Sequence, residues 1–303
     1  MTQLQGEGAV APLCVLMGVS RASYYRDWSE RSPKAEETQL RDLVQRLALG
    51  ERFYGYRRIT ELVRRTGWWV NRKRIQRLMQ EDNLLALRRG RLFRPATTQS
   101  RHGFVRWPNL ARSLIPTGID QLWVADITYV RLSEAFVYLA VVLDAFSRKV
   151  VGWAMADHLR AELAIDALEM ALRARKPHGL GLVHHSDQGV QYACEGYIQR
   201  LQDAGVQPSM SRPGCPYDNA MAESFMKTLK TEEVDGSAYR DLAHAKSRIA
   251  AFIEAIYNPK RLHSALGYRS PEEFETDRQN HPHLSTTRRP LPRPATTTTT
   301  VPY

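Results

Sequence analysis

The stretch QLWVADITYVRLSEAFVYLAVVLDAFSRKVVGWAMAD, residues 121–157, decides the fold class. It contains three runs rich in β-branched and aromatic residues, at 122–130, 135–147 and 149–157, separated by short turns. Runs of this composition favour β-strands, and short turns join antiparallel neighbours. The stretch therefore predicts a three-stranded antiparallel meander.

The pattern changes after this meander. Periodicity and turn residues predict a helix over 160–176, a strand over about 180–185, a helix over 194–204, a short strand over 206–210 and a helix from about 218. Three consecutive strands followed by alternating helices and strands indicate an α/β domain, in which helices pack on a mixed sheet.

Two helix-turn-helix patterns precede the strands. The first covers 8–27 with a turn at Gly18, and the second covers 54–84 with a turn at Gly67. Ser20 and Asn71 stand where the second helix of each pair begins, and both residue types are good N-caps. The region before the sheet is therefore predicted to be all-α.

The last helix of this region has a basic face. We expect four side chains there to contact DNA phosphates or the major groove: Arg72, Lys73, Arg74 and Arg77. A solvated basic face on a small helical bundle is the alternative. The charge distribution favours DNA, because residues 1–116 contain 22 Lys and Arg against 10 Asp and Glu, whereas the remainder contains 21 against 22.

Three acids in the sheet region call for a chemical explanation. Asp126 lies inside an apolar strand, Asp187 follows the strand at 180–185, and Glu223 lies in a predicted helix, with 35 residues between Asp187 and Glu223. Burying an ionised carboxylate is costly unless a cation neutralises it. If the three acids converge, they suit two Mg²⁺ or Mn²⁺ ions, the arrangement used for displacement at phosphorus.

The helix of Glu223 carries further candidates. Asn219, Glu223, Lys227 and Lys230 fall at successive spacings of four, four and three residues along one predicted helical face. We expect Asn219, Lys227 and Lys230 to contact DNA beside the metal ions. Ordinary pairing between Lys227 and Glu223 is the alternative.

These motifs resemble a known family. WVADITYV, HHSDQGVQY and SRPGCPYDNAMAESFMKTLKTE, with the closing YNPKRLHSALGYRSPEEFE at 257–275, are similar to the catalytic domain of insertion-sequence transposases of the second-frame (OrfB) type, relatives of retroviral integrases. The resemblance implies a ribonuclease H-like fold, a metal-binding triad of Asp126, Asp187 and Glu223, and a functional basic residue at Lys230. It also implies that an upstream-frame (OrfA) protein can be a partner.

The expected function is a Mg²⁺-dependent DNA transposase that cleaves element ends and joins the 3′-hydroxyl to target DNA. A divalent-metal DNA nuclease and a DNA-binding regulator with an inactive sheet domain are the alternatives. The expected domains are a helix-turn-helix region at 1–84, a basic linker at 85–118, an integrase catalytic domain at 119–278 and a disordered tail at 279–303.

The expected partners are double-stranded DNA, namely terminal inverted repeats and target, and further copies of the chain on that DNA. Three widely spaced cysteines indicate neither a zinc site nor disulfides, which fits a reducing cytoplasm. The resemblance implies a bacterial, nucleoid-associated protein. No apolar run approaches the length of a membrane span. The terminal repeat sequence, the target preference and the oligomeric state do not follow from the sequence.

Overall fold

The computed structural model describes residues 10–25, 35–87, 103–176, 181–212 and 219–281 of the 303-residue chain. The predicted disordered tail beyond 281, and the part of the predicted linker at 88–102, lie outside the described residues. Within the described residues, no helix is both long and apolar enough to cross a membrane.

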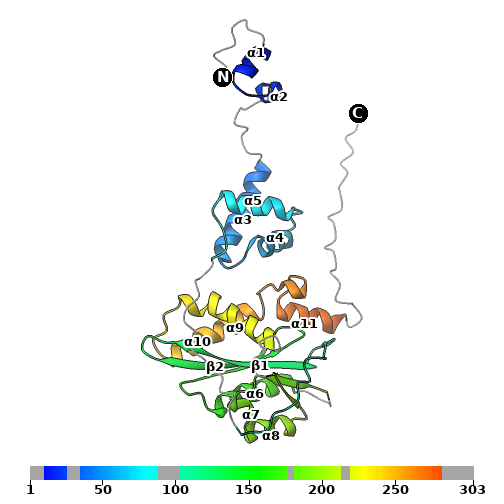
Figure 1. Cartoon of the computed structure of the whole chain (residues 1–303), viewed down its shortest axis with the longest axis vertical. Coiled ribbons are helices and arrows are strands. Elements are labelled where there is room, and N and C mark those ends of the chain that lie inside the picture. Colours follow the sequence, from blue (N-terminus) through cyan, green and yellow to red (C-terminus); the bar gives the residue numbers. More distant parts are fainter. Residues whose placement is uncertain (1–9, 26–34, 88–102, 177–180, 213–218, 282–303) are drawn as a thin grey trace.

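One five-stranded mixed sheet, in the order β3-β2-β1-β4-β5, organises the larger part of the chain (Figure 1). Its strands are β1 (Leu122–Arg131), β2 (Phe136–Asp144), β3 (Val150–Ala156), β4 (Val183–Ser186) and β5 (Gln207–Met210). β1, β2 and β3 pair antiparallel, whereas β4 runs parallel to β1 and β5 runs parallel to β4. The predicted meander and mixed sheet are confirmed.

Helices cover both faces of this sheet (Figure 1). One face packs against α6 (Ala161–Arg175), α7 (Val190–Ala193) and α8 (Glu195–Asp203), and the other against α9 (Ala220–Glu232), α10 (Leu242–Ala251) and the π-helical turn Phe252–Tyr257. Side chains alternate along β1, so that Trp123 and Ala125 join the core under α6 while Leu122 and Val124 join the core under α9. Alternation therefore places the next even-numbered residue, Asp126, on the α9 face.

The chain closes with the short 3₁₀ turn Ser264–Leu266 and with α11 (Pro271–Asn280). Ser270 begins α11 with a full capping box: its hydroxyl accepts from the backbone N–H of Glu273, whose carboxylate accepts from the N–H of Ser270. Pro271 occupies the first helical turn, where its missing N–H costs nothing. The local sequence thus fixes where α11 starts.

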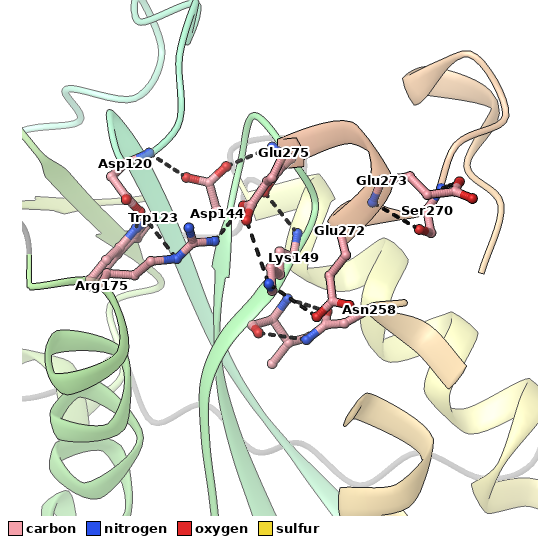
Figure 2. Close-up of polar contacts among 12 residues, drawn as sticks. Asp120, Trp123, Asp144, Lys149, Arg175, Asn258, Ser270, Glu272, Glu273 and Glu275 are labelled. Carbon is pink, nitrogen blue, oxygen red and sulfur yellow. Dashed lines mark hydrogen bonds and ion pairs between the residues drawn. The ribbon is translucent and has the colours of Figure 1, made fainter. Parts of the chain in front are cut away.

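Charged side chains fasten α11 to the sheet (Figure 2). Glu275 of α11 pairs with Arg175 at the end of α6, and it accepts a 2.6 Å hydrogen bond from the hydroxyl of Ser147. The buried Asp144 accepts from the backbone N–H groups of Ser147 and Asp120, at 2.7 Å each. Because every charge in this buried cluster has a partner, α11 and the β2–β3 turn are held as one unit.

The basic region before the sheet contains a helical module, which we define as α3 (Ala35–Gly50), α4 (Tyr56–Arg65) and α5 (Arg72–Glu81). Its core contains Leu40, Val44, Ile59, Val63, Ile75 and Leu78, all fully buried. The predicted turn at Gly67 has a φ of 93°, and the side chain of Asn71 caps α5 by accepting from the N–H of Lys73 at 2.9 Å. The second predicted helix-turn-helix pattern is confirmed as helices, and α3 adds to it a helix that was not predicted.

The first predicted pair of helices is also present, as α1 (Val10–Leu16) and α2 (Arg21–Tyr24). Gly18 makes the turn with a φ of 63°, and the Ser20 side chain caps α2. Gly18 and Ser20 therefore have the predicted roles, as the turn residue and as the N-cap of the second helix.

The helical module contacts the closing segment of the sheet domain. The hydroxyl of Tyr54 accepts a 2.9 Å hydrogen bond from the backbone N–H of Leu262, whose buried side chain joins the core of the module. Arg65 pairs with Glu273 at 2.7 Å and donates to the carbonyl of Tyr268 at 2.9 Å. The segment 257–275 is thus the surface on which the module docks.

Candidate active site

Asp126 and Asp187 stand at equivalent places on two neighbouring parallel strands. β1 pairs with β4 up to Val124 and His185, and each aspartate lies two residues beyond its member of that pair. Adjacent strands lie about 4.8 Å apart, so this register brings the two carboxylates to one edge of the sheet. The Asp187 carboxylate accepts from the N–H of Gly189 at 2.9 Å, which fixes the turn leading into α7.

Glu223 approaches the same edge from α9, which packs over β1. Its side chain is exposed, whereas those of Asp126 and Asp187 are partly buried. The three acids therefore come from a central strand, the end of its parallel neighbour and the helix above them, and Asp187 and Glu223 are near enough to act on the charge of Asp126.

The pKa of the Asp126 carboxyl responds to the two other acids. The pKa of its carboxyl is raised to about 7, mainly by burial and in part by the nearby carboxylates of Asp187 and Glu223. The N–H of Ile127, which donates to the Asp126 carboxylate at 2.9 Å, and the ammonium of Lys230 act in the opposite direction. The site is therefore a place where negative charge is poorly compensated by the protein.

The donor set around Asp126 fits a hard divalent cation. Its members are the carboxylates of Asp126, Asp187 and Glu223. Oxygen donors of this kind are those that Mg²⁺ and Mn²⁺ take. In the described part of the chain, however, no three His, Cys, Asp or Glu side chains are grouped closely enough to hold a metal ion, so a shared ion requires the carboxylates to turn toward one another.

The two histidines before Asp187 have structural partners. His184 is hydrogen-bonded to the hydroxyl of Tyr197 at 2.9 Å, and His185 lies between the hydroxyls of Ser209 and Ser211 at 2.8 and 3.1 Å. Burial lowers the pKa of His184 to about 3, so it is neutral at physiological pH. Their imidazoles hold β4 against its neighbours.

Asn219 differs from its expected setting. Its side chain is buried, and its Nδ2 donates to the carbonyl of Ala125 at 2.9 Å, which ties the start of α9 to β1 beside Asp126. α9 begins only at Ala220 and Asn219 has a φ of −121°, so its side chain does not follow the helical face of Glu223. The structure thus gives Asn219 an internal contact in place of the exposed helical position on which its predicted DNA contact was based.

The two lysines of α9 are accessible to different degrees. Lys227 is exposed, whereas Lys230 is partly buried with its Nζ 3.9 Å from the ring centroid of Tyr129 in β1. A cation above an aromatic face is attracted by the ring quadrupole. Lys230 therefore has a defined position from which its charge acts on Asp126.

Comparisons with known proteins assign the chain to a family. Residues 116–216 and 204–271 match families described as Integrase core domain, and residues 34–91 match an HTH-like domain. The transposase for insertion sequence element IS904 of Lactococcus lactis is 40% identical over 73% of this chain and 87% of its own length. Transposase InsF for insertion sequence IS3A of Escherichia coli is 34% identical over 89% of this chain and 95% of its own length. The chain belongs to the insertion-sequence transposases.

The Integrase core match and the mixed sheet give this transposase the predicted ribonuclease H-like fold. Among solved structures, a simian T-cell lymphotropic virus intasome in complex with the PP2A regulatory subunit B56 gamma aligns with a TM-score of 0.44 and 13% identity, over 86% of this chain and 80% of that chain. The HTLV-2 integrase catalytic core domain in complex with magnesium aligns with a TM-score of 0.38 and 14% identity, over 52% of this chain and 95% of that chain.

The basic residues of α5 in this transposase are not equivalent. Arg74 and Arg77 lie 3.9 and 3.4 Å from the carboxylate of Glu37 in α3, and Arg77 also pairs with Glu81. Arg72 and Lys73, in the first turn, are exposed. A DNA contact by Arg74 or Arg77 therefore competes with acids of the module itself, and the predicted role of these four residues stays a prediction.

The pKa of Asp126 yields a prediction about the stability of the transposase. Because the folded-state pKa of about 7 exceeds the ordinary 3.8, the folded protein holds the proton more tightly, and stability falls as pH rises between these values. In EDTA, Asp126→Asn should therefore raise the melting temperature by several degrees at pH 8 and by less at pH 5. Mg²⁺ should raise the melting temperature of the wild type at pH 8 and have much less effect on the variant. If the melting temperatures of the wild type and of Asp126→Asn respond identically to pH and to Mg²⁺, Asp126 neither has a raised pKa nor binds the ion.

Proposed function

We propose that this transposase cleaves the ends of its insertion sequence and joins the resulting 3′-hydroxyl to target DNA, with Asp126, Asp187 and Glu223 as the ligands of two Mg²⁺ or Mn²⁺ ions. The supporting observation is the raised pKa of Asp126, to which acids from two other elements contribute. Divalent ions held there would activate the attacking oxygen and stabilise the leaving one.

The chemistry proposed is two successive displacements at phosphorus. In cleavage, the oxygen of water forms a new bond to the phosphorus at the element end, and the bond from that phosphorus to the 3′-oxygen breaks. In joining, the freed 3′-oxygen bonds to a target phosphorus, whose own 3′-oxygen leaves. The proton of the attacking group passes to solvent in each step, so that no covalent intermediate with the protein is needed.

The chain's own side chains would hold the DNA in line for these steps. Lys230, fixed over Tyr129 and close enough to lower the pKa of Asp126, is suited to a phosphate next to the scissile one. Lys227 lies one turn nearer to Glu223 and is exposed. Positioning of this kind supplies much of the rate of a displacement reaction.

The partners proposed for this transposase are duplex DNA, further copies of the chain and a second protein. The HTH-like match and the basic charge of the first third of the chain support binding to duplex DNA at the terminal inverted repeats and target. We further propose that the active form is an oligomer of this chain on DNA in the bacterial cytoplasm, associated with the nucleoid, and that an upstream-frame (OrfA) protein acts with it.

A joining assay tests the proposal. The full chain is incubated with Mg²⁺, a supercoiled plasmid and a labelled duplex that carries the terminal repeat of its own insertion sequence. Label joined covalently to the plasmid is the expected result, and EDTA should abolish it. Nicked plasmid without joined label would indicate a nuclease, and DNA binding with neither product would indicate a regulator.

A further inference from the structure

A cavity of about 490 Å³ lies on the helical module, away from the three acids. Its wall is formed by α4, the start of α5 and Tyr268 of the closing segment. Residues of the HTH-like region and of the integrase core therefore line one space. A cavity of this volume is in the range that accommodates a small ligand or a single nucleotide.

The cavity is positively charged. Arg57, Arg64 and Arg72 line it, against a single carboxylate from Glu61. Arg64 is held in place, since it pairs with Glu61 at 3.0 Å and donates to the carbonyl of Val70 at 3.2 Å. Arg57 and Arg72 are exposed. Two guanidinium groups thus remain beyond the internal pair, and guanidinium groups match the geometry of phosphate oxygens.

Aromatic rings stand beside these charges. Trp69 is 59% exposed although it is a large apolar side chain, and the guanidinium of Arg64 lies 5.8 Å from its ring centroid. Tyr268 has a φ of 62°, a left-handed conformation that is unusual outside glycine. The backbone of Tyr268 is held there by bonds to Arg65 and His263 at 2.9 and 2.8 Å, so the fold maintains strain at a residue that lines the cavity.

We propose that this cavity binds an unpaired nucleotide of a DNA strand, with its phosphate at Arg57 and Arg72 and its base stacked on Trp69. A concave site of this size cannot admit a paired base, whose faces are covered by its neighbours in the stack. Exposed aromatic rings combined with basic groups are what proteins use to hold single-stranded DNA. The inference rests on the proposed function, because cleavage and joining produce unpaired DNA near the ends being processed.

Two arginines of α5, Arg72 and Arg77, differ in their relation to the cavity. Arg72, at the start of α5, belongs to the cavity, whereas Arg77 pairs with Glu37 and Glu81 of the module. Arg77→Ala therefore serves as a matched control for the preference between the two DNA forms, since it removes the same type of charge from the same helix without altering the cavity. Loss of a duplex contact by Arg77 lowers the affinity for both probes alike and leaves their ratio unchanged. Trp69→Phe is the second control, because it keeps an aromatic face.

The test uses the full chain and two fluorescein-labelled probes, a blunt duplex and the same duplex with a single-stranded extension of thymidines. The wild type should prefer the extended probe, and Trp69→Ala should reduce that preference by about tenfold, the loss expected for one stacked base. Arg57→Ala should reduce affinity for the extended probe more than for the blunt one. Trp69→Phe should retain most of the preference, and Arg77→Ala all of it.

Fluorescence supplies a second measurement. Oligothymidylate should quench the tryptophan emission of the wild type, and the quenching should be much smaller in Trp69→Phe. Equal affinity of the wild type for both probes, or an unchanged preference in Trp69→Ala, would overturn the inference. The joining assay with wild-type protein separates this outcome from failure of the proposed function. If the wild type forms joined product but does not prefer the extended probe, only the binding of a nucleotide in the cavity is refuted.

Discussion

Replacing Asp126 or Asp187 by asparagine, or Glu223 by glutamine, should reduce DNA joining by at least about a thousandfold. Each 1.36 kcal/mol of lost transition-state stabilisation costs a factor of ten, and removing a metal ligand should cost several kcal/mol. The amides keep the size of the side chains and remove only the charge. Affinity for duplex DNA should change by less than about twofold, because the excess positive charge lies in the first third of the chain.

Joining and duplex affinity are measured on the same preparations, by the plasmid assay and by fluorescence anisotropy. Glu195→Gln is the matched control, since Glu195 is an exposed acid at the start of α8 and should retain wild-type activity. If any one of the three amide variants keeps more than about a tenth of the wild-type joining rate, that residue does not ligate a catalytic ion.

Much of this site could be predicted from local sequence. Apolar runs and turn residues locate β1 and β4. They thereby place Asp126 inside β1 and Asp187 directly after β4. The helical period locates Glu223 and Lys230 on α9. Such patterns are visible because the side chains of one strand or helix repeat with a fixed period.

Contacts between distant segments could not be predicted in the same way. Arg261 forms a buried ion pair with Glu232 at the end of α9, at 2.7 Å, and Asn258 donates to the Val150 carbonyl and accepts from the Val150 N–H, both at 3.0 Å. Arg261 and Asn258 lie in the closing motif at 257–275, which the sequence identifies only by resemblance. Their roles depend on which backbone groups the fold brings opposite them.

Asn219 does not lie on the helical face expected for it, for a local reason, and its predicted DNA contact stays a prediction. A helix that starts one or two residues earlier would put Asn219 in line with Glu223, and helix boundaries are the least certain part of any periodic pattern. Because α9 begins at Ala220, the amide of Asn219 turns back to β1 instead. The cavity beside Trp69 was missed for another reason: its lining comes from segments nearly 200 residues apart, and no single period contains them.

A substitution as small as Gly152→Ala should severely destabilise the fold. Gly152 lies in β3 where this strand crosses α6, and an added Cβ would stand 2.2 Å from the carbonyl oxygen of Ala167 and 2.7 Å from the amide nitrogen of Ala171. Both atoms belong to the helix backbone, so a change of rotamer cannot relieve the overlap. The strand and helix would have to separate, which would open the core that Ala167 and Ala171 share with β1.

We expect Gly152→Ala to lower the free energy of unfolding by at least about 3 kcal/mol, at the upper end of the cost of overpacking a core. Urea denaturation followed by circular dichroism measures the change. Gly50→Ala is the matched control, because no atom lies within 4 Å of an added Cβ there, and its stability should stay close to that of the wild type. The pairing of the two variants separates steric overlap from the general effect of replacing glycine, which reduces the entropy of the unfolded chain in both. A Gly152→Ala protein as stable as Gly50→Ala would mean that β3 and α6 lie farther apart than the structure places them.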